Sequence, residues 1–284
     1  MSKIQTVGVI GAGTMGNGIA QASAASGIDV VMVDVADAAV KRGVATITTS
    51  LDRLLKKEKI AAADRDAALA RILGTTDYEA LKTVDLVIEA ATENQELKYR
   101  ILRQADSLAK PSAILASNTS SISITQLAAV TSRPEAFIGM HFFNPVPMMA
   151  LVELIHGLQT ADTTVAAAEA FAKRLGKTPI VVKNSPGFVV NRILCPMLNE
   201  AIFTLQEGLA TAEDIDKGMK LGCNHPIGPL ALADMIGLDV LLAVMNVFYG
   251  DFNDPKYRPA PLLKEMVAAG YLGRKSGRGF YTYA

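Results

Sequence analysis

Apolar residues in the first half of the chain form short runs that alternate with longer mixed stretches. Thr6 to Ile10 and Ile28 to Val33 are nearly continuous apolar runs, and the residues between them suit a helix that ends near Gly27. A strand, a helix and a second strand within about thirty residues predict a βαβ unit. Unbroken apolar runs are typical of parallel strands that are covered on both faces.

Further strand-like runs continue this alternation, with helical stretches at Glu93 to Ala109 and Thr163 to Leu175. The predicted strands are Leu86 to Glu89, Ala113 to Ala116, Phe137 to Met140, Leu151 to Ile155 and Ile180 to Val182. Repetition of this kind predicts a doubly wound, Rossmann-like α/β sheet.

Asp37 to Leu73 interrupts the alternation, because this stretch is rich in alanine and charged residues and shows no strand signal. A single helix of that length would extend beyond the sheet, since each residue adds 1.5 Å. We therefore predict an inserted helical hairpin at about residues 37–73, with a break around Ile60 to Asp64.

The pattern changes near Ser185, after which strand signals disappear. The predicted helices are Phe188 to Gln206, Ala212 to Lys220 and Leu230 to Phe248. Thr211, with Asp214 three residues later, resembles a capping box at a helix start. The sequence thus predicts an α/β domain at residues 1–184 and a smaller all-α domain at residues 185–284.

Composition and charge narrow the class of protein. Half of the residues are hydrophobic and 20% are charged, which indicates a folded chain with a sizeable core. The 28 basic and 28 acidic side chains cancel, 28 − 28 = 0, so we expect no nucleic-acid partner. Asp234 and Asp239 interrupt the most apolar long stretch, Ile227 to Phe248, which favours a buried helix over a membrane span.

The ends and the cysteines add expectations about location and metals. Met1-Ser2-Lys3 leads directly into the first apolar run without the pattern of a signal peptide. Cys195 and Cys223 are too few for a disulfide framework or a four-thiolate zinc site. Cys223 and His225 are two residues apart, but no second pair of ligands accompanies them. We expect a soluble cytoplasmic protein with no membrane association and no bound metal.

A glycine-rich run follows the first predicted strand at once: Gly11-Ala12-Gly13-Thr14-Met15-Gly16. In a G-x-G-x-x-G run the glycines allow a tight turn, backbone access to a pyrophosphate and close helix–strand packing. Asp34 ends the next strand, 34 − 16 = 18 residues later, where a carboxylate accepts hydrogen bonds from the adenosine ribose and repels a 2′-phosphate. The context predicts NAD rather than NADP binding, and the alternative is a structural turn with a solvated aspartate.

Three histidines are candidates for chemistry. His141 lies at the carboxyl end of a predicted strand, where open α/β sheets bind ligands. His156 follows a strand, and His225 lies in a loop with proline and glycine. Position alone leaves His141 open to either a structural or a catalytic role.

At these motifs the sequence resembles the 3-hydroxyacyl-CoA dehydrogenases, and the resemblance covers essentially the whole chain. Besides the glycine-rich run, it rests on Val87-Ile88-Glu89-Ala90, Ser117-Asn118-Thr119-Ser120-Ser121, His141-Phe142-Phe143-Asn144-Pro145, Leu151-Val152-Glu153, Pro186-Gly187-Phe188-Val189-Val190-Asn191-Arg192 and Gly277-Arg278-Gly279-Phe280-Tyr281.

The resemblance implies His141 as the catalytic acid–base residue and Glu153 as its partner. It places Ser120 and Asn191 at the substrate, in a cleft between the two domains, and Asn144 in the loop around His141. The further cofactor contacts that it implies are Ala91, Glu93, Lys98, Ser117 and Asn118. Turn and cap chemistry is the alternative for the serine cluster.

The resemblance also implies NAD as cofactor and a CoA thioester as substrate, with interconversion of short-chain (S)-3-hydroxyacyl-CoA and 3-ketoacyl-CoA. Lys56 and Lys57 lie, with Arg53 and Lys59, in the densest basic run of the predicted hairpin, and these four residues are candidate contacts for CoA phosphates. A solvated helix face explains them equally well. The apolar helices of the all-α domain, together with the resemblance, predict a homodimer through that domain.

Two rival functions stay open at this point. A β-hydroxyacid dehydrogenase acting on a free acid shares the glycine-rich start, but it would use a lysine as the acid–base residue and a cation for the substrate carboxylate. A non-catalytic NAD-binding structural protein would use the fold alone.

Overall fold

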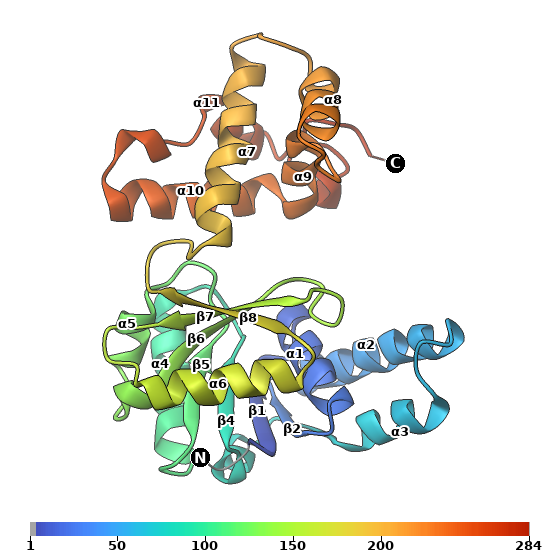
Figure 1. Cartoon of the computed structure of the whole chain (residues 1–284), viewed down its shortest axis with the longest axis vertical. Coiled ribbons are helices and arrows are strands. Elements are labelled where there is room, and N and C mark those ends of the chain that lie inside the picture. Colours follow the sequence, from blue (N-terminus) through green and yellow to red (C-terminus); the bar gives the residue numbers. More distant parts are fainter. Residues whose placement is uncertain (1–3, 284) are drawn as a thin grey trace. The chain divides into compact units, whose positions relative to one another are not determined.

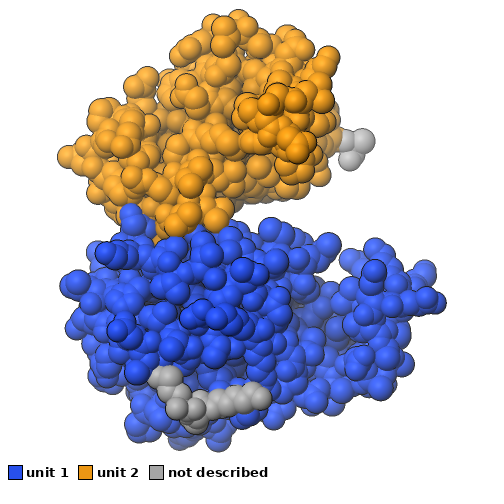
Figure 2. Space-filling model, viewed as in Figure 1, with its two compact units in different colours: residues 1–185 blue, residues 186–284 orange. Residues whose placement is uncertain are grey.

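The computed structural model describes residues 4–283; Met1-Ser2-Lys3, part of the signal-peptide argument, lies outside the described residues. The chain divides into two compact units, Met1–Ser185 and Pro186–Ala284 (Figure 2). The first is an α/β unit and the second is helical.

An eight-stranded sheet forms unit 1, with the strand order β3-β2-β1-β4-β5-β6-β7-β8. The strands are β1 (Thr6–Ile10), β2 (Asp29–Val33), β3 (Ile72–Thr75), β4 (Leu86–Glu89), β5 (Ile114–Ser117), β6 (Phe137–Phe142), β7 (Leu151–His156) and β8 (Thr178–Lys183). Every neighbouring pair is parallel except β6 with β7. The predicted Rossmann-like fold class is confirmed.

Helices pack on the sheet and bury its apolar strands. In Figure 1, α6 crosses the strands of unit 1, and it contacts β6, β7 and β8. The helices of unit 1 are α1 (Thr14–Ala25), α2 (Asp37–Lys56), α3 (Ala62–Ala70), α4 (Gln95–Leu108), α5 (Ile124–Ala128) and α6 (Asp162–Arg174), with 3₁₀ turns η1 (Tyr78–Thr83) and η2 (Pro134–Ala136). Val9, Ile19, Ile88 and Met140 are fully buried in the resulting core.

The inserted hairpin consists of α2 and α3, which project from the edge of unit 1 in Figure 1. The break between them covers residues 57–61, slightly earlier than expected. The prediction that no strand lies between residues 37 and 73 was wrong, because β3 begins at Ile72 and pairs with β2. This edge strand is only four residues long, includes Gly74 and leaves Leu73 exposed, so it lacks the apolar run that marks the central strands.

The loop between β6 and β7, residues 143–150, contains no helix. A parallel connection needs a crossover of about a dozen residues or more, so a loop of this kind requires an antiparallel turn. The resulting register places His141 directly opposite Glu153. Because opposite residues of an antiparallel pair project from the same face, this register brings the two side chains together.

Unit 2 is all-α, as predicted. Its helices are α7 (Val190–Gln206), α8 (Ala212–Gly222), α9 (Pro229–Ile236), α10 (Leu238–Phe252) and α11 (Pro261–Ala268), with 3₁₀ turns η3 (Pro255–Tyr257) and η4 (Arg274–Ser276). Leu198, Leu230 and Phe248 lie in its buried core. The Thr211 hydroxyl accepts a hydrogen bond from the backbone N–H of Asp214, as the capping box predicted.

The prediction of one helix from Leu230 to Phe248 was wrong. α9 and α10 meet at Gly237, whose φ is +104°, and their axes differ by 96°. The apolar pattern continues across this glycine, which hides the turn in the sequence. Among the described helices none is by itself long and apolar enough to cross a membrane; this bent pair passes a test of length and composition only when taken together.

Gly237→Ala is expected to destabilise the protein by about 1–3 kcal/mol, because a side chain at this φ is strained. The free energy of unfolding from urea denaturation measures the effect. Gly218→Ala is the matched control: Gly218 lies within α8, and an added Cβ meets no atom within 4 Å. That variant should be at least as stable as the parent. Equal stability of the two variants would contradict the assigned role of Gly237.

Candidate active site

The glycine-rich loop joins β1 to α1 and needs glycine at two positions for steric reasons. Gly11 has a φ of +103°, and an added Cβ would lie 2.7 Å from the Cα of Ala91. A Cβ on Gly16 would lie 1.8 Å from the carbonyl oxygen of Gly11. At Gly13, by contrast, an added Cβ would meet nothing within 4 Å, so the space beside this residue is open.

This loop fits the pyrophosphate of a dinucleotide. Gly13 is the N-cap of α1, makes no side-chain cap, and no acidic residue follows in the first turn. The uncapped N–H groups and the positive end of the helix dipole therefore attract an anion. The open space beside Gly13 lets a phosphate approach the backbone.

Asp34 lies just beyond β2 and is tied to the same loop. Its Oδ2 accepts a hydrogen bond from the N–H of Ala12 at 2.8 Å. The side chain is partly buried. A negative charge is thereby fixed against the glycine-rich loop, where the sequence predicts the adenosine ribose.

Glu89, at the carboxyl end of β4, is fully buried and organises three of the predicted cofactor contacts. Its Oε1 accepts from the N–H of Ala91 at 2.8 Å. Its Oε2 lies 2.5 Å from the Nζ of Lys98 and 2.7 Å from the Oγ of Ser117. One carboxylate thus connects β4, β5 and α4 at the edge of the sheet where the glycine-rich loop lies.

Lys98 is only 1% exposed, and Ser117 is fully buried. The ammonium of Lys98 therefore has a structural partner inside the protein, and its contact with the cofactor stays a prediction, as do those of Ala91 and Ser117. Sequence reasoning gave Glu89 no role of its own. A carboxylate ending a buried strand, followed nine residues later by a lysine, was the available signal.

Glu93 and Asn118 organise the neighbouring polar loop. Glu93 Oε1 accepts from both the N–H and the Oγ of Ser120, at 2.6 and 2.9 Å. Its Oε2 accepts from Thr119 Oγ1 at 2.8 Å. The Oδ1 of Asn118 accepts from the N–H of Phe142 at 2.9 Å, which attaches this loop to the strand that carries the histidine.

His141 and Glu153 form a buried hydrogen-bonded pair. The Nδ1 of His141 lies 2.7 Å from the Oε2 of Glu153. Glu153 is fully buried and His141 is 6% exposed, while the ring of Phe143 lies beside the imidazole with centroids 4.5 Å apart. The carboxylate fixes the orientation of the imidazole and favours a proton on Nδ1.

A groove in unit 1 lies between α1, α2 and the 143–150 loop. Its polar lining includes Arg42, Arg53 and Asn144. Lys56 and Lys57 are exposed near the end of α2 and do not line this groove. Of the predicted basic run, the structure therefore places Arg53 along this groove, together with Arg42, which was not predicted. It leaves Lys56 and Lys57 as predicted contacts on the adjoining surface.

Asn191 lies in the first turn of α7 in unit 2, so its approach to the reacting group stays a prediction. Burial raises the pKa of the Cys195 thiol to about 12, which suits a buried core residue and not a nucleophile. Within residues 4–283, no three His, Cys, Asp or Glu side chains are arranged to hold a metal ion.

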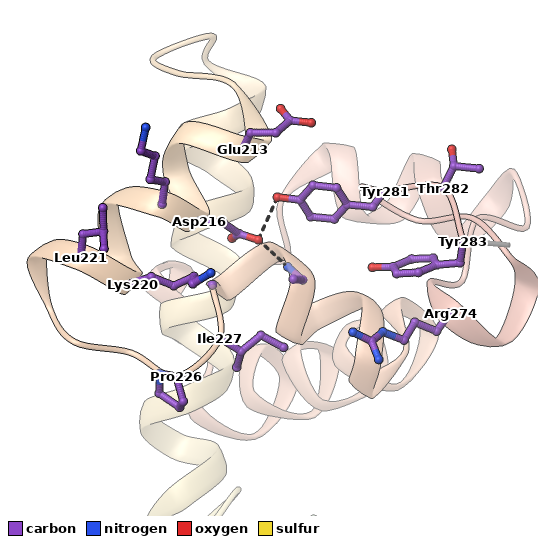
Figure 3. Close-up of a pocket in the computed structure, with 13 residues that line it drawn as sticks. Glu213, Asp216, Lys220, Leu221, Pro226, Ile227, Arg274, Tyr281, Thr282 and Tyr283 are labelled. Carbon is purple, nitrogen blue, oxygen red and sulfur yellow. Dashed lines mark hydrogen bonds between the residues drawn. The ribbon is translucent and has the colours of Figure 1, made fainter.

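Unit 2 contains a separate pocket beside α8 (Figure 3). Asp216 is buried at its base and accepts hydrogen bonds from the N–H groups of Leu230 and Ala231 and from the hydroxyl of Tyr281. Burial and this hydrogen bond raise the pKa of the Tyr281 phenol. The carboxylate caps the start of α9, so it has a structural role in the pocket.

Asp234 ties the last residues of the chain to α9. Its carboxylate is 1% exposed and accepts hydrogen bonds from the N–H groups of Phe280 and Tyr281. It also accepts from the hydroxyl of Tyr283 at 2.9 Å. Residues 280–283 are thereby part of the packed unit.

The NAD-binding domain of 3-hydroxyacyl-CoA dehydrogenase matches residues 6–185, and the C-terminal domain of that enzyme matches residues 187–283. The chain belongs to the 3-hydroxyacyl-CoA dehydrogenase family. This confirms the family resemblance, the NAD cofactor and the class of enzyme, an NAD-dependent oxidoreductase.

Relatives in this 3-hydroxyacyl-CoA dehydrogenase family match along nearly the whole chain. The 3-hydroxybutyryl-CoA dehydrogenase of Bradyrhizobium diazoefficiens is 53% identical over 99% of this chain and 96% of the relative. A probable 3-hydroxybutyryl-CoA dehydrogenase of Deinococcus radiodurans is 55% identical over 97% and 99%. The (S)-3-hydroxybutyryl-CoA dehydrogenase of Ralstonia eutropha, whose crystal structure is known, is 71% identical in sequence over 99% of this chain and 100% of that one. The TM-score between the two structures is 0.98.

Glu89→Gln should lower the free energy of unfolding by roughly 3 kcal/mol, because the buried ammonium of Lys98 would lose its nearest carboxylate and keep only Glu93, 3.7 Å away. The same variant should bind NADH more weakly, since the amide nitrogen that replaces Oε2 cannot accept a hydrogen bond from Ser117. Urea denaturation and fluorescence titration with NADH measure the two effects. Glu79→Gln, in an exposed pair with Lys82, is the control and should change neither. Unchanged stability of Glu89→Gln would refute the central role of this carboxylate.

Proposed function

We propose that the protein interconverts (S)-3-hydroxybutyryl-CoA and acetoacetyl-CoA, with hydride transfer to or from NAD. The observation that carries this proposal is the buried His141–Glu153 pair at 2.7 Å. The names of the relatives support the substrate, because those that match over nearly the full chain are 3-hydroxybutyryl-CoA dehydrogenases.

The pair suits the proton transfer that this reaction needs. Oxidation of a secondary alcohol removes the hydroxyl proton while hydride leaves the same carbon for the nicotinamide. Imidazole side chains exchange protons near neutral pH, and a carboxylate that orients the ring stabilises its protonated form. Because Nδ1 of His141 is hydrogen-bonded to Glu153, we assign proton exchange with the substrate to Nε2 of the same ring. In the reverse reaction, the protonated imidazole donates to the ketone oxygen.

Two further side chains are proposed to bind the reacting part of the substrate. Asn191 would donate a hydrogen bond to a substrate oxygen and stabilise developing charge. Ser120 would do the same once its single hydroxyl hydrogen turns from Glu93, which accepts it in this structure, to the substrate. The pyrophosphate of NAD would lie on the glycine-rich loop and its adenosine ribose at Asp34. The nicotinamide ring of the bound NAD would supply the hydride acceptor.

The CoA part of the substrate is assigned to the groove between α1, α2 and the 143–150 loop. The loop that forms one wall of this groove begins two residues after His141, so a ligand there leads toward the catalytic pair. Arg42 and Arg53 provide positive charge for phosphates, with Lys56 and Lys57 on the adjoining surface.

The free-acid alternative requires a lysine as the acid–base residue. Among the described residues of unit 1, the two buried lysines already have partners: Lys98 contacts Glu89, and Lys177 donates to two backbone carbonyls. These contacts support the CoA-dependent reaction over the free-acid reaction.

We also propose a cytoplasmic homodimer that associates through the C-terminal domain. Ile193 on α7 and Val240 on α10 support this assembly, because they are large apolar side chains that are 66% and 46% exposed in unit 2. Sedimentation velocity tests the dimer, and a monomer at micromolar concentration would overturn it.

The substrate is tested by following NADH absorbance at 340 nm with acetoacetyl-CoA and, separately, with free acetoacetate. We expect NADH oxidation with the thioester only, and much slower oxidation of NADPH because Asp34 repels its 2′-phosphate. Turnover of free acetoacetate would support the free-acid reaction instead. NADH binding without turnover of any acyl-CoA would support a non-catalytic role.

His141→Gln should lower kcat by about 10²–10⁴, the usual contribution of general acid–base catalysis. NADH affinity should be retained, because the histidine lies on β6 and not in the glycine-rich loop. His156→Gln is the control, since His156 ends the neighbouring strand with a partly exposed side chain, and it should keep normal kcat. Near-normal turnover by His141→Gln would refute the assigned mechanism.

A further inference from the structure

Lys177 is a buried cation that the proposed reaction does not use. It lies between α6 and β8, and its side chain is 9% exposed. Among the described residues, no carboxylate oxygen lies within 4.0 Å of its ammonium. Burial lowers the pKa of this lysine from its usual value. Because a buried charge is costly unless it is hydrogen-bonded, its partners show what it stabilises.

Those partners are backbone carbonyls of the 143–150 loop. The Nζ of Lys177 donates to the carbonyl oxygens of Val146 at 2.6 Å and Met149 at 2.8 Å. Hydrogen bonds from an ionised donor are roughly twice as strong as neutral ones. Within the loop, the N–H groups of Met148 and Met149 both donate to the carbonyl oxygen of Pro145 at 3.0 Å. One ammonium therefore closes a turn that the chain's own backbone bonds begin.

This loop has open space on two sides. One side faces the groove formed with α1 and α2, and Lys177 and Pro147 line a second cavity beneath α1 and the hairpin. Val146 is buried against Gly18, where an added Cβ would lie 2.9 Å from the Val146 Cβ. Because cavities lie on both sides of this loop, side-chain packing constrains it less than it would constrain a loop packed against a core. The ammonium of Lys177 therefore has more influence on the position of the loop.

We propose that Lys177 is a positioning residue for the acyl-CoA substrate. By holding the carbonyls of Val146 and Met149, it fixes the loop that forms one wall of the groove. The same loop joins the strand of His141 to the strand of Glu153. This inference rests on the proposed function, because it takes the groove's occupant to be the CoA part of the substrate.

Lys177→Met keeps the length of the side chain and removes the donor. We expect the KM for acetoacetyl-CoA to rise roughly tenfold or more, with kcat and the KM for NADH changed by less than about threefold. Lys177→Arg, which retains a charged donor, should recover most of the lost affinity. Lys173→Met is the matched control on the exposed face of α6, where Lys173 pairs with Glu169, and should behave like the parent.

Amide hydrogen exchange tests whether Lys177 holds the 143–150 loop in place, and it does not rely on enzyme activity. In Lys177→Met, the amides of Met148 and Met149 should exchange at least about tenfold faster than in the parent, while those of β6 stay protected. A parent protein that does not act on acetoacetyl-CoA would refute the proposed function, but it would not refute the role of Lys177 in holding the 143–150 loop. Unchanged exchange in the loop, or an unchanged KM for acetoacetyl-CoA in the active enzyme, would overturn the role of Lys177. If Lys177→Met does not fold, Lys177→Leu, which also removes the donor, is judged by the same two criteria.

Discussion

The antiparallel pairing of β6 with β7 is the constraint on which the candidate site depends. It places a histidine and a glutamate directly across from each other, so backbone hydrogen bonds fix the distance between their side chains. A parallel pairing would need a crossover segment and would separate the two residues. The short turn that replaces this crossover also becomes a wall of the groove beside α1 and α2. One change of strand direction therefore determines both the proposed catalytic pair and the groove assigned to the substrate.

Buried charges then connect this edge of the sheet to its surroundings. Glu89 joins two strands and a helix near the glycine-rich loop. Lys177 donates to backbone carbonyls of the loop between β6 and β7. Each would be costly in an apolar interior without several hydrogen bonds. Both side chains come from ordinary positions at the end of a strand or helix, and both act on loops. The loops that carry binding residues are thus held by charge as well as by packing.

The sequence was sufficient to predict the α/β sheet, the hairpin and the glycine-rich site, because those features have strong local patterns. It did not reveal β3, whose four residues pair only at an edge, or the turn at Gly237, because the apolar pattern runs through it. The roles of Glu89 and Lys177 were not predicted, for a different reason. Apart from Lys98, nine residues after Glu89, their partners are distant in sequence or are backbone atoms, and no side-chain pattern reports such contacts. Arg53 could be predicted because it lies in one basic run with Lys56 and Lys57, whereas Arg42 lies earlier in α2 and outside that run.

The contacts of Asp234 make residues 280–283 part of the packed helical unit. Loss of residues 280–283 would leave two buried carboxylates, Asp216 and Asp234, without their tyrosine partners. A premature stop codon or a carboxypeptidase acting near this end would therefore affect the interior of unit 2. In cells, a chain clipped there would be a substrate for protein quality control, although every residue of the proposed chemistry would still be present.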